Sequence, residues 1–375
     1  QPPATGWSEG LGPFTPVVRD GKLYGRGCSD DGYSVYAALT AIRALEDAGI
    51  PHPRAVGLIE TREESGSNDL EHYLKKNAAR FGSPRLVCVL DSGAGNYEQL
   101  WLTSSLRGAC AIDLNVRVLR QGMHSGTASG VVPSSFDVLR ILLDRIQDPR
   151  TGAILDPAFN VEIPSNRMDD LKKTAEVLGD GFISEFPWAE GPNGSVQSRC
   201  RGTEEALIAR CWKPTLSVTG AAGLPPLSMA GNSLRSDTTL RLSFRLPPTA
   251  KTENILPALQ KKLLTDPPFN AVVSIAGGDA LPGWNAPSEA DWFRSACDES
   301  SKALWGKPAM RIGEGGSIPI LNLFEAQFPR AQFAVTGVLG PGSNAHNADE
   351  SLDLAYTEKF IAAVGYLAAS IPEEA

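Results

Sequence analysis

Several features that would place this chain in a membrane or a secretory class are missing. None of the apolar runs in its 375 residues approaches the length of a membrane span, and no signal-peptide pattern opens the chain. The six cysteines are scattered without a C-x-x-C pair, which favours reduced thiols over a disulfide framework. We therefore expect a cytoplasmic protein that has no membrane partner.

An excess of basic charge is missing too. The 35 Lys and Arg residues are outnumbered by 43 Asp and Glu residues, which gives a formal net charge of -8. This balance argues against nucleic acid or an anionic membrane surface as the main partner. The length allows two domains with sizeable cores, and 42% hydrophobic residues are ordinary for a globular protein.

Acidic residues follow predicted strands in the first hundred residues. Glu63 and Glu64 come after the apolar segment 55–60, and Asp91 ends the apolar run 86–90. Ligands of open α/β sheets bind outside the carboxyl ends of the strands, so these side chains are expected to meet at one site.

Histidine is scarce, with four in the chain, and one of them completes the pattern. Asp30 lies in a glycine-rich segment, and His346 lies far downstream between a Gly-Pro-Gly turn and the last predicted helix. Carboxylates together with an imidazole are the ligands of hydrolytic zinc or manganese sites, and a spare carboxylate can act as general base. The sequence therefore favours metal-dependent hydrolysis.

The spacing of apolar residues predicts two kinds of architecture. Strands and helices alternate up to about residue 104 and again from about 308, which predicts a mostly parallel sheet covered by helices. Between them a strand-helix-strand-strand-helix-strand order predicts a ferredoxin-like α+β unit. We expect an α/β catalytic domain, 1–104 and 308–375, interrupted by an inserted domain, 105–307.

The elements behind this division are short runs with clear periodicity. The polar stretch 156–211 has little periodicity, which predicts an insertion or a long connection. Asn68 is expected to cap a helix, with Glu71 completing a capping box. The predicted strands are 22–26, 55–60, 86–90, 109–119, 238–246, 271–275 and 332–335. The predicted helices are 34–48, 134–146, 255–264, 318–328 and 356–370.

Five motifs in this order resemble the M20 family of metallopeptidases, nearest to the cytosolic nonspecific dipeptidase and carnosinase group. They are DGKLYGRG at 20–27 followed by Asp30-Asp31, EESGS at 63–67, SLRG at 105–108, GMHSG at 122–126 and GGSIP at 315–319. Each is weak alone, but together they cover the chain from end to end. The resemblance implies hydrolysis of dipeptides or short peptides by water activated between two metal ions.

The resemblance also implies roles for named residues. Asp30 would bridge two divalent ions, Asp91 would bind one of them with a further histidine, and Glu64 and His346 would bind the other. Zinc is expected, with manganese or cobalt possible. Glu63 would be the general base, and the peptide bond between Asp30 and its neighbour is expected to be cis.

Substrate contacts follow from the same resemblance. Arg245 would hold the free carboxylate of the substrate, with Ser317 beside it and Asn232 adding a polar contact nearby. His124 would steady the reaction intermediate, reaching the site of the partner subunit in a homodimer formed through the inserted domain. The expected ligand is a small peptide or an N-acyl amino acid.

One part of the family pattern lies outside this sequence. The family's first histidine ligand belongs to an H-x-D motif, and the sequence begins at Gln1, just after the place for that motif. We expect a preceding segment to carry it. Two alternatives stay open here: an N-acyl amino acid deacylase or desuccinylase with the same site, and a non-catalytic dimeric binding protein without a full metal site.

Overall fold

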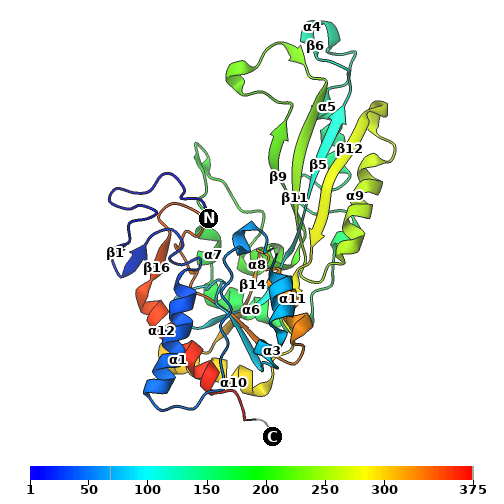
Figure 1. Ribbon diagram of the computed structural model, residues 1–375. Coiled ribbons are helices and arrows are strands. Elements are labelled where there is room, and N and C mark those ends of the chain that lie inside the picture. The colour runs from blue at the N-terminus through cyan, green and yellow to red at the C-terminus, as the bar shows by residue number, and fades with distance from the viewer. Residues whose placement is uncertain (68, 374–375) are drawn as a thin grey trace.

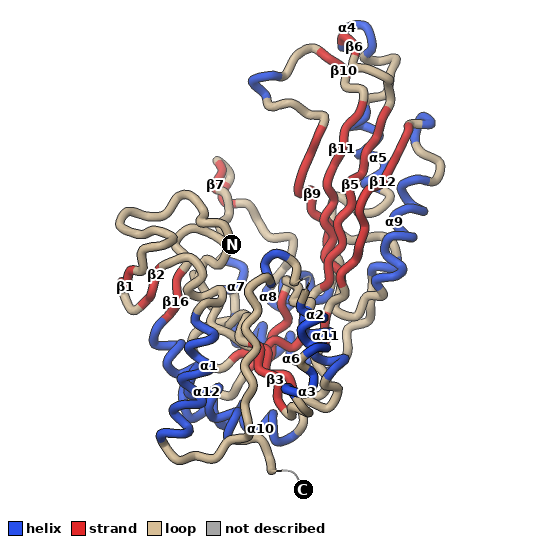
Figure 2. The backbone as a smooth tube through the Cα atoms, viewed as in Figure 1, coloured by secondary structure: helices blue, strands red, loops and turns tan. Residues whose placement is uncertain are grey.

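The protein is described here by a computed structural model that covers residues 1–67 and 69–373. It has an α/β body from which a long sheet-and-helix projection rises (Figures 1 and 2). The mixed α/β class predicted from the sequence is confirmed. Among the described residues, no helix is both long and apolar enough to cross a membrane.

The centre of the body contains two small groups of strands. β3 (Leu86–Val89) pairs in parallel with β15 (Gln332–Val335). β4 (Trp101–Leu106) pairs in parallel with β14 (Met310–Glu314) and antiparallel with β13 (Trp284–Asn285). All six residues of β4 are buried, so this strand runs through the centre of the body.

Three helices pack on one another at one side of the body, because each carries an apolar stripe. In α1 (Tyr33–Asp47), the buried residues Tyr33, Ala37, Ala41 and Leu45 recur every fourth position. The first three of them join a core that also includes Trp101. The partner helices are α10 (Asp291–Trp305) and α12 (Leu354–Ala369).

The projection is built on an antiparallel sheet with strand order β12-β5-β11-β9. Alternate residues of β11 are buried, so one face of the sheet is apolar, and two helices cover that core. The strands are β5 (Gly108–Arg117), β9 (Thr215–Ala222), β11 (Asp237–Leu246) and β12 (Val272–Leu281). The helices are α5 (Ser135–Asp144) and α9 (Ile255–Leu264).

Smaller elements complete the fold. The tip of the projection carries β6 (Met123–His124), α4 (Ser125–Ala128) and β10 (Ser233–Leu234). A three-stranded sheet near the N-terminus consists of β1 (Val17–Arg19), β2 (Lys22–Tyr24) and β16 (Ser351–Asp353). Further short elements are β7 (Glu190–Gly191), β8 (Gly194–Ser195), α2 (Leu70–Lys76), α3 (Ala78–Phe81), α7 (Gly181–Ser184) and α11 (Ile320–Gln327).

The strand predicted at 55–60 is wrong. This segment forms no strand, and its apolar residues Val56, Leu58 and Ile59 are exposed. A strand needs a hydrogen-bonded neighbour, and no other described strand pairs with this one. The predicted cap Asn68 lies outside the described residues, and α2 begins after Asp69.

The stretch 156–211, predicted as an insertion or a long connection, is not a mere connection, because it holds two substantial helices. α6 (Ser165–Leu178) and α8 (Thr203–Trp212) pack on each other and on β14 of the body. The hydroxyl of Thr174 donates to the carbonyl of Arg311 at 2.8 Å. The buried stripe of α6 includes Arg167 and Thr174, and such polar core residues hid its periodicity.

These contacts bear on the division into domains. Helix α10 packs on α12, and α6 and α8 pack on β14, although all three helices lie within the predicted inserted segment 105–307. The division at residues 104 and 308 stays a prediction. The packing favours assigning only the projection to the inserted unit and these three helices to the body.

Candidate metal centre

Three of the predicted metal ligands meet in the body. The nearest ligand atoms of Asp30, Glu64 and His346 all lie within 4.8 Å of one another. His346 Nε2 is 2.7 Å from an oxygen of Asp30 and 3.1 Å from an oxygen of Glu64. Two carboxylates and an imidazole nitrogen converging on one point suit a divalent ion such as zinc, manganese or cobalt.

Each of these residues comes from a different segment. Asp30 lies just before α1, Glu64 lies in a short 3₁₀ turn, and His346 lies in the loop that leads to β16. The peptide bond between Asp30 and Asp31 is cis, as predicted. More than 300 positions separate the first and last of the three, so only the tertiary fold brings them together.

A buried carboxylate that sequence reasoning missed holds the Asp30 loop. Glu350 has no solvent exposure, and one of its oxygens accepts hydrogen bonds from the backbone N–H groups of Ser29 and Asp30, both at 3.1 Å. The other oxygen accepts from the backbone N–H of Gly27 at 2.8 Å and from Arg26 Nη1 at 2.6 Å. Because Glu350 lies four positions after His346, it ties the loops of two predicted ligands together.

Further acidic residues surround the three-residue group. The pKa of Asp91 is raised to about 8, first by burial and then by the negative charge of neighbours that include Asp31 and Asp30. The pKa of Glu63 is raised by burial and by the charge of Glu64. Mutual repulsion among crowded carboxylates is relieved when cations bind between them.

Asp91 is the predicted ligand that stands outside the group. It follows β3, and its pKa responds to Asp30 and Glu64, which places it in the same acidic region. It is not among the three residues whose ligand atoms come together in the described part of the chain. Its role as a ligand therefore stays a prediction.

Two other predicted site residues lie at the tip of the projection, where β6 and β10 pair far along the sheet from the body (Figures 1 and 2). His124 Nδ1 accepts a hydrogen bond from the backbone N–H of Gly126 at 3.1 Å. The carbonyl of Asn232 accepts from the backbone N–H of Ser125 at 2.9 Å. Within one subunit the length of β11 separates Asn232 from Arg245, so the contact of Asn232 with the substrate stays a prediction.

Arg245 and Ser317 do meet, at the other end of β11. The Nη1 of Arg245 donates to the hydroxyl of Ser317 at 3.4 Å. Arg245 is half-buried and forms no ion pair with the described residues. Its guanidinium is therefore free to bind a carboxylate.

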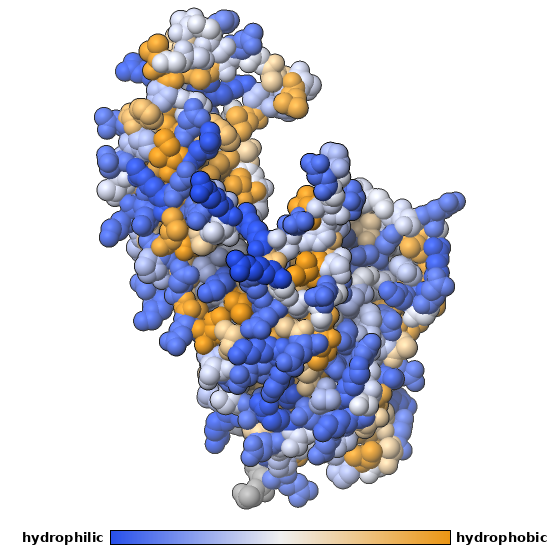
Figure 3. Space-filling model, turned by 180° about the vertical axis from the view of Figure 1, so that it is seen from behind, coloured by the Kyte–Doolittle hydropathy of each residue, from blue (hydrophilic) through white to orange (hydrophobic). Residues whose placement is uncertain are grey.

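Seen from behind, a cleft opens between the projection and the body (Figure 3).

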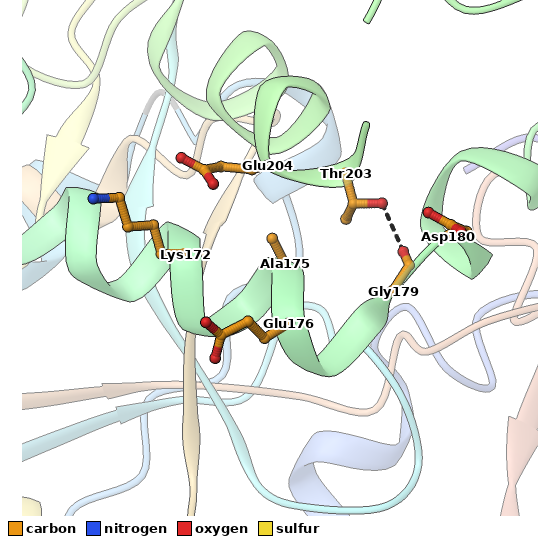
Figure 4. A pocket seen from close by; sticks show the side chains of 7 residues that line it. All are labelled: Lys172, Ala175, Glu176, Gly179, Asp180, Thr203 and Glu204. Carbon is orange, nitrogen blue, oxygen red and sulfur yellow. Dashed lines mark hydrogen bonds between the residues drawn. The ribbon is translucent and has the colours of Figure 1, made fainter. Parts of the chain in front are cut away.

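An open hollow of about 340 Å³ lies elsewhere, between α6 and α8. Figure 4 shows that Lys172 and Glu176 of α6 and Glu204 of α8 surround it, while the hydroxyl of Thr203 bonds to the carbonyl of Gly179. None of these residues belongs to the acidic group around Asp30. The hollow is therefore separate from the three converging ligands.

Comparison with known proteins decides the family. The family model described as "Peptidase family M20/M25/M40" matches residues 1–371. The chain belongs to this family. It is accordingly a metal-dependent peptidase, and thus a hydrolase, as the five motifs predicted.

Relatives match nearly the whole chain at modest identity. The chain is 27% identical over 361 residues to "Cys-Gly metallodipeptidase dug1" of Schizosaccharomyces pombe, covering 93% of this chain and 72% of that protein. It is 26% identical to "Cysteinylglycine-S-conjugate dipeptidase" of Corynebacterium striatum, covering 89% and 71%. By contrast, a desuccinylase from Methylobacillus flagellatus matches 14% of the chain, although at 50% identity.

Solved structures share the fold of this family member. The dipeptidase Dug1p of Saccharomyces cerevisiae superposes with a TM-score of 0.76 at 23% identity, covering 98% of this chain and 77% of that one. Human carnosine dipeptidase 1 superposes with a TM-score of 0.74 at 21% identity, covering 97% and 76%. At these identities the likeness establishes the architecture alone.

Proposed function

We propose that this peptidase hydrolyses the peptide bond of dipeptides that carry a free terminal carboxylate, with two divalent metal ions, zinc first among them. The observation that carries the proposal is the meeting of Asp30, Glu64 and His346, with Glu63 adjacent in sequence. The full-length relatives with dipeptidase names support dipeptides over N-acyl amino acids as substrates. The non-catalytic alternative has no comparable support.

The residues present have separate roles in such a reaction, namely metal binding and proton transfer. Asp30, Glu64 and His346 would hold metal, with Asp91 in the same acidic region. A divalent ion there would supply Lewis acidity and lower the pKa of water. Glu63, whose pKa is raised by burial, takes a proton from the attacking water and passes it to the leaving amine.

A substrate panel tests the proposal directly. The purified protein is assayed with zinc, manganese or cobalt on dipeptides, on their C-terminal amides and on N-acyl amino acids. We expect turnover of dipeptides well above the other two classes. A preference for N-acyl amino acids would instead select the deacylase alternative, and no turnover of any class with any metal would contradict the proposal.

Arg245 is proposed to hold the substrate's carboxylate together with Ser317. Replacing Arg245 by Ala is expected to raise KM for a dipeptide about 10- to 100-fold, the range for loss of a charge-assisted hydrogen bond. KM for the dipeptide amide, which has no carboxylate, should change little. The exposed Arg241, paired with Asp113, provides the matched control, and equal losses on both substrates would contradict the assignment.

A homodimer through the projection is proposed to bring His124 of one subunit to the site of the other. The projection exposes large apolar side chains, among them Leu227 at 94%, Val131 at 85% and Met229 at 74%. His124 lies exposed at its tip, far along the sheet from the body of its own chain. We expect sedimentation analysis to give twice the chain mass of 39.9 kDa. A monomer that remains fully active would contradict the dimer.

A further inference from the structure

One buried arginine, Arg107, stands where the chain leaves the body for the projection. It lies between the end of β4 and the start of β5, and only 8% of its surface is exposed. Among the described residues, Arg107 has no carboxylate partner. Its guanidinium instead donates hydrogen bonds to uncharged carbonyl and hydroxyl oxygens. Burial lowers the pKa of Arg107 to about 10, which leaves the side chain charged at neutral pH.

The oxygens that Arg107 binds belong to two other segments. Its Nε donates to the carbonyl of Gly315 at 3.2 Å, in the turn that leads from β14 to Ser317. Its Nη1 donates to the hydroxyl of Thr215 at 3.2 Å and to the carbonyl of Lys213 at 3.5 Å. These last two residues form a second passage between body and projection, from α8 to β9.

The backbone of Arg107 makes a further link to the proposed substrate site. Its carbonyl accepts a hydrogen bond from the hydroxyl of Ser317. The same hydroxyl accepts from Arg245 Nη1. Arg107 therefore fixes Ser317 from both sides of its turn, through the carbonyl of Gly315 and through its own carbonyl.

The junction around Arg107 has little room to rearrange. A Cβ added at Gly108 would lie 2.4 Å from the carbonyl oxygen of Leu281, and one at Gly283 would lie 2.7 Å from that of Leu106. A Cβ at Gly315 would lie 3.1 Å from Arg107 Nη2. The chain passes between body and projection at Arg107, at 213–215 and, for a third time, at 281–284. These three passages are in close contact here.

We propose that Arg107 is a positioning residue that sets Ser317, and through it Arg245, for the carboxylate of the substrate, and couples both to the orientation of the projection. This inference rests on the proposed dipeptidase function. An uncompensated buried charge is costly, and the fork of a guanidinium is suited to reaching several acceptors at once. Arg107 itself does not touch the substrate.

Steady-state kinetics on a dipeptide and its C-terminal amide test this role. For Arg107→Ala we expect KM for the dipeptide to rise about 10-fold, the loss associated with about 1.4 kcal/mol of hydrogen bonding, with kcat changed much less. KM for the amide should stay near its original value, and added guanidinium should recover part of the loss. Arg241→Ala, which breaks an exposed ion pair in the same sheet, is the control.

Two further variants sharpen the result. Arg107→Lys should not restore KM, because one ammonium cannot reach both passages as the planar fork does. Thr215→Val removes a single acceptor and is expected to raise KM for the dipeptide about threefold, even if the alanine variant fails to fold. Full recovery with lysine, or equal losses on dipeptide and amide, would overturn the inference.

Hydrogen exchange separates this inference from the proposed function, because it needs no turnover. In Arg107→Ala or Arg107→Lys, amide exchange at 315–318 and at 213–216 should accelerate together, while α9 keeps its protection. If the original protein hydrolyses no dipeptide, the proposed function fails, but joint acceleration still supports the coupling. Unchanged exchange in both segments overturns the coupling whatever the activity.

Discussion

Glu63→Gln is expected to lower kcat for dipeptide hydrolysis about 10³-fold, within the range for removing a general acid-base group. The amide of glutamine has the shape of the carboxylate but cannot accept and return a proton. Glu63 is not one of the three converging ligands, so the metal content should stay that of the original protein. Kinetics on the metal-loaded protein, with elemental analysis, check both parts.

The neighbouring Glu64 gives a contrast, and exposed Glu71 gives a control. Glu64→Gln weakens a proposed ligand, so it should lose both metal and activity. Glu71→Gln only breaks an exposed pair with Lys75 and should change neither. A Glu63→Gln protein with near-normal kcat would remove this residue from the mechanism. If it lost metal in the same proportion as activity, Glu63 would have to be a ligand instead.

Glu350→Gln is expected to weaken metal binding about 10- to 100-fold. This is the range found when a group that orients metal ligands is lost. The amide NH₂ would face the backbone N–H groups that one carboxylate oxygen now satisfies, and Arg26 would lose its buried counter-charge. Breaking a buried pair costs about 3–5 kcal/mol, so the thermal midpoint should also fall by several degrees. Metal titration and thermal unfolding measure the two effects.

An exposed ion pair provides the control for Glu350. Glu98 pairs with Lys307 at the surface, where such pairs contribute about 0–1 kcal/mol, so Glu98→Gln should leave metal affinity and the midpoint unchanged. Glu350→Gln with wild-type metal affinity would show that the Asp30 loop keeps its shape by other contacts. The proposed link between the loops of Asp30 and His346 would then be wrong.

Where local pattern and tertiary packing agree, the sequence sufficed to predict the fold. Helix 255–264 and strand 332–335 have the predicted bounds, because the helix buries a regular apolar stripe and the strand is buried along almost its whole length. In the segment 55–60 the pattern is equally apolar, yet no neighbouring strand pairs with it, so it stays exposed. Pairing is a property of distant segments, which local spacing cannot supply.

The candidate site shows the same contrast between residues that the sequence predicts and residues that only the fold reveals. Motif resemblance placed Asp30, Glu64 and His346 at one site, and the fold brings them together. Glu350 escaped notice, because a carboxylate whose partners are backbone N–H groups leaves no motif in sequence. Its spacing of four residues after His346 was the one available signal. The separation of Asn232 from Arg245 within one subunit was not visible beforehand, because spacing in sequence does not reveal which end of a ten-residue strand a loop joins.

Anomalous diffraction from crystals grown with zinc tests the central claim most directly, because it locates the metal without reference to activity. Data collected on both sides of the zinc absorption edge should show a peak within bonding distance of Asp30, Glu64 and His346, about 2.0–2.2 Å from their ligand atoms. The peak should vanish in His346→Ala crystals. A zinc peak elsewhere in the molecule, with none between these three residues, would contradict the account.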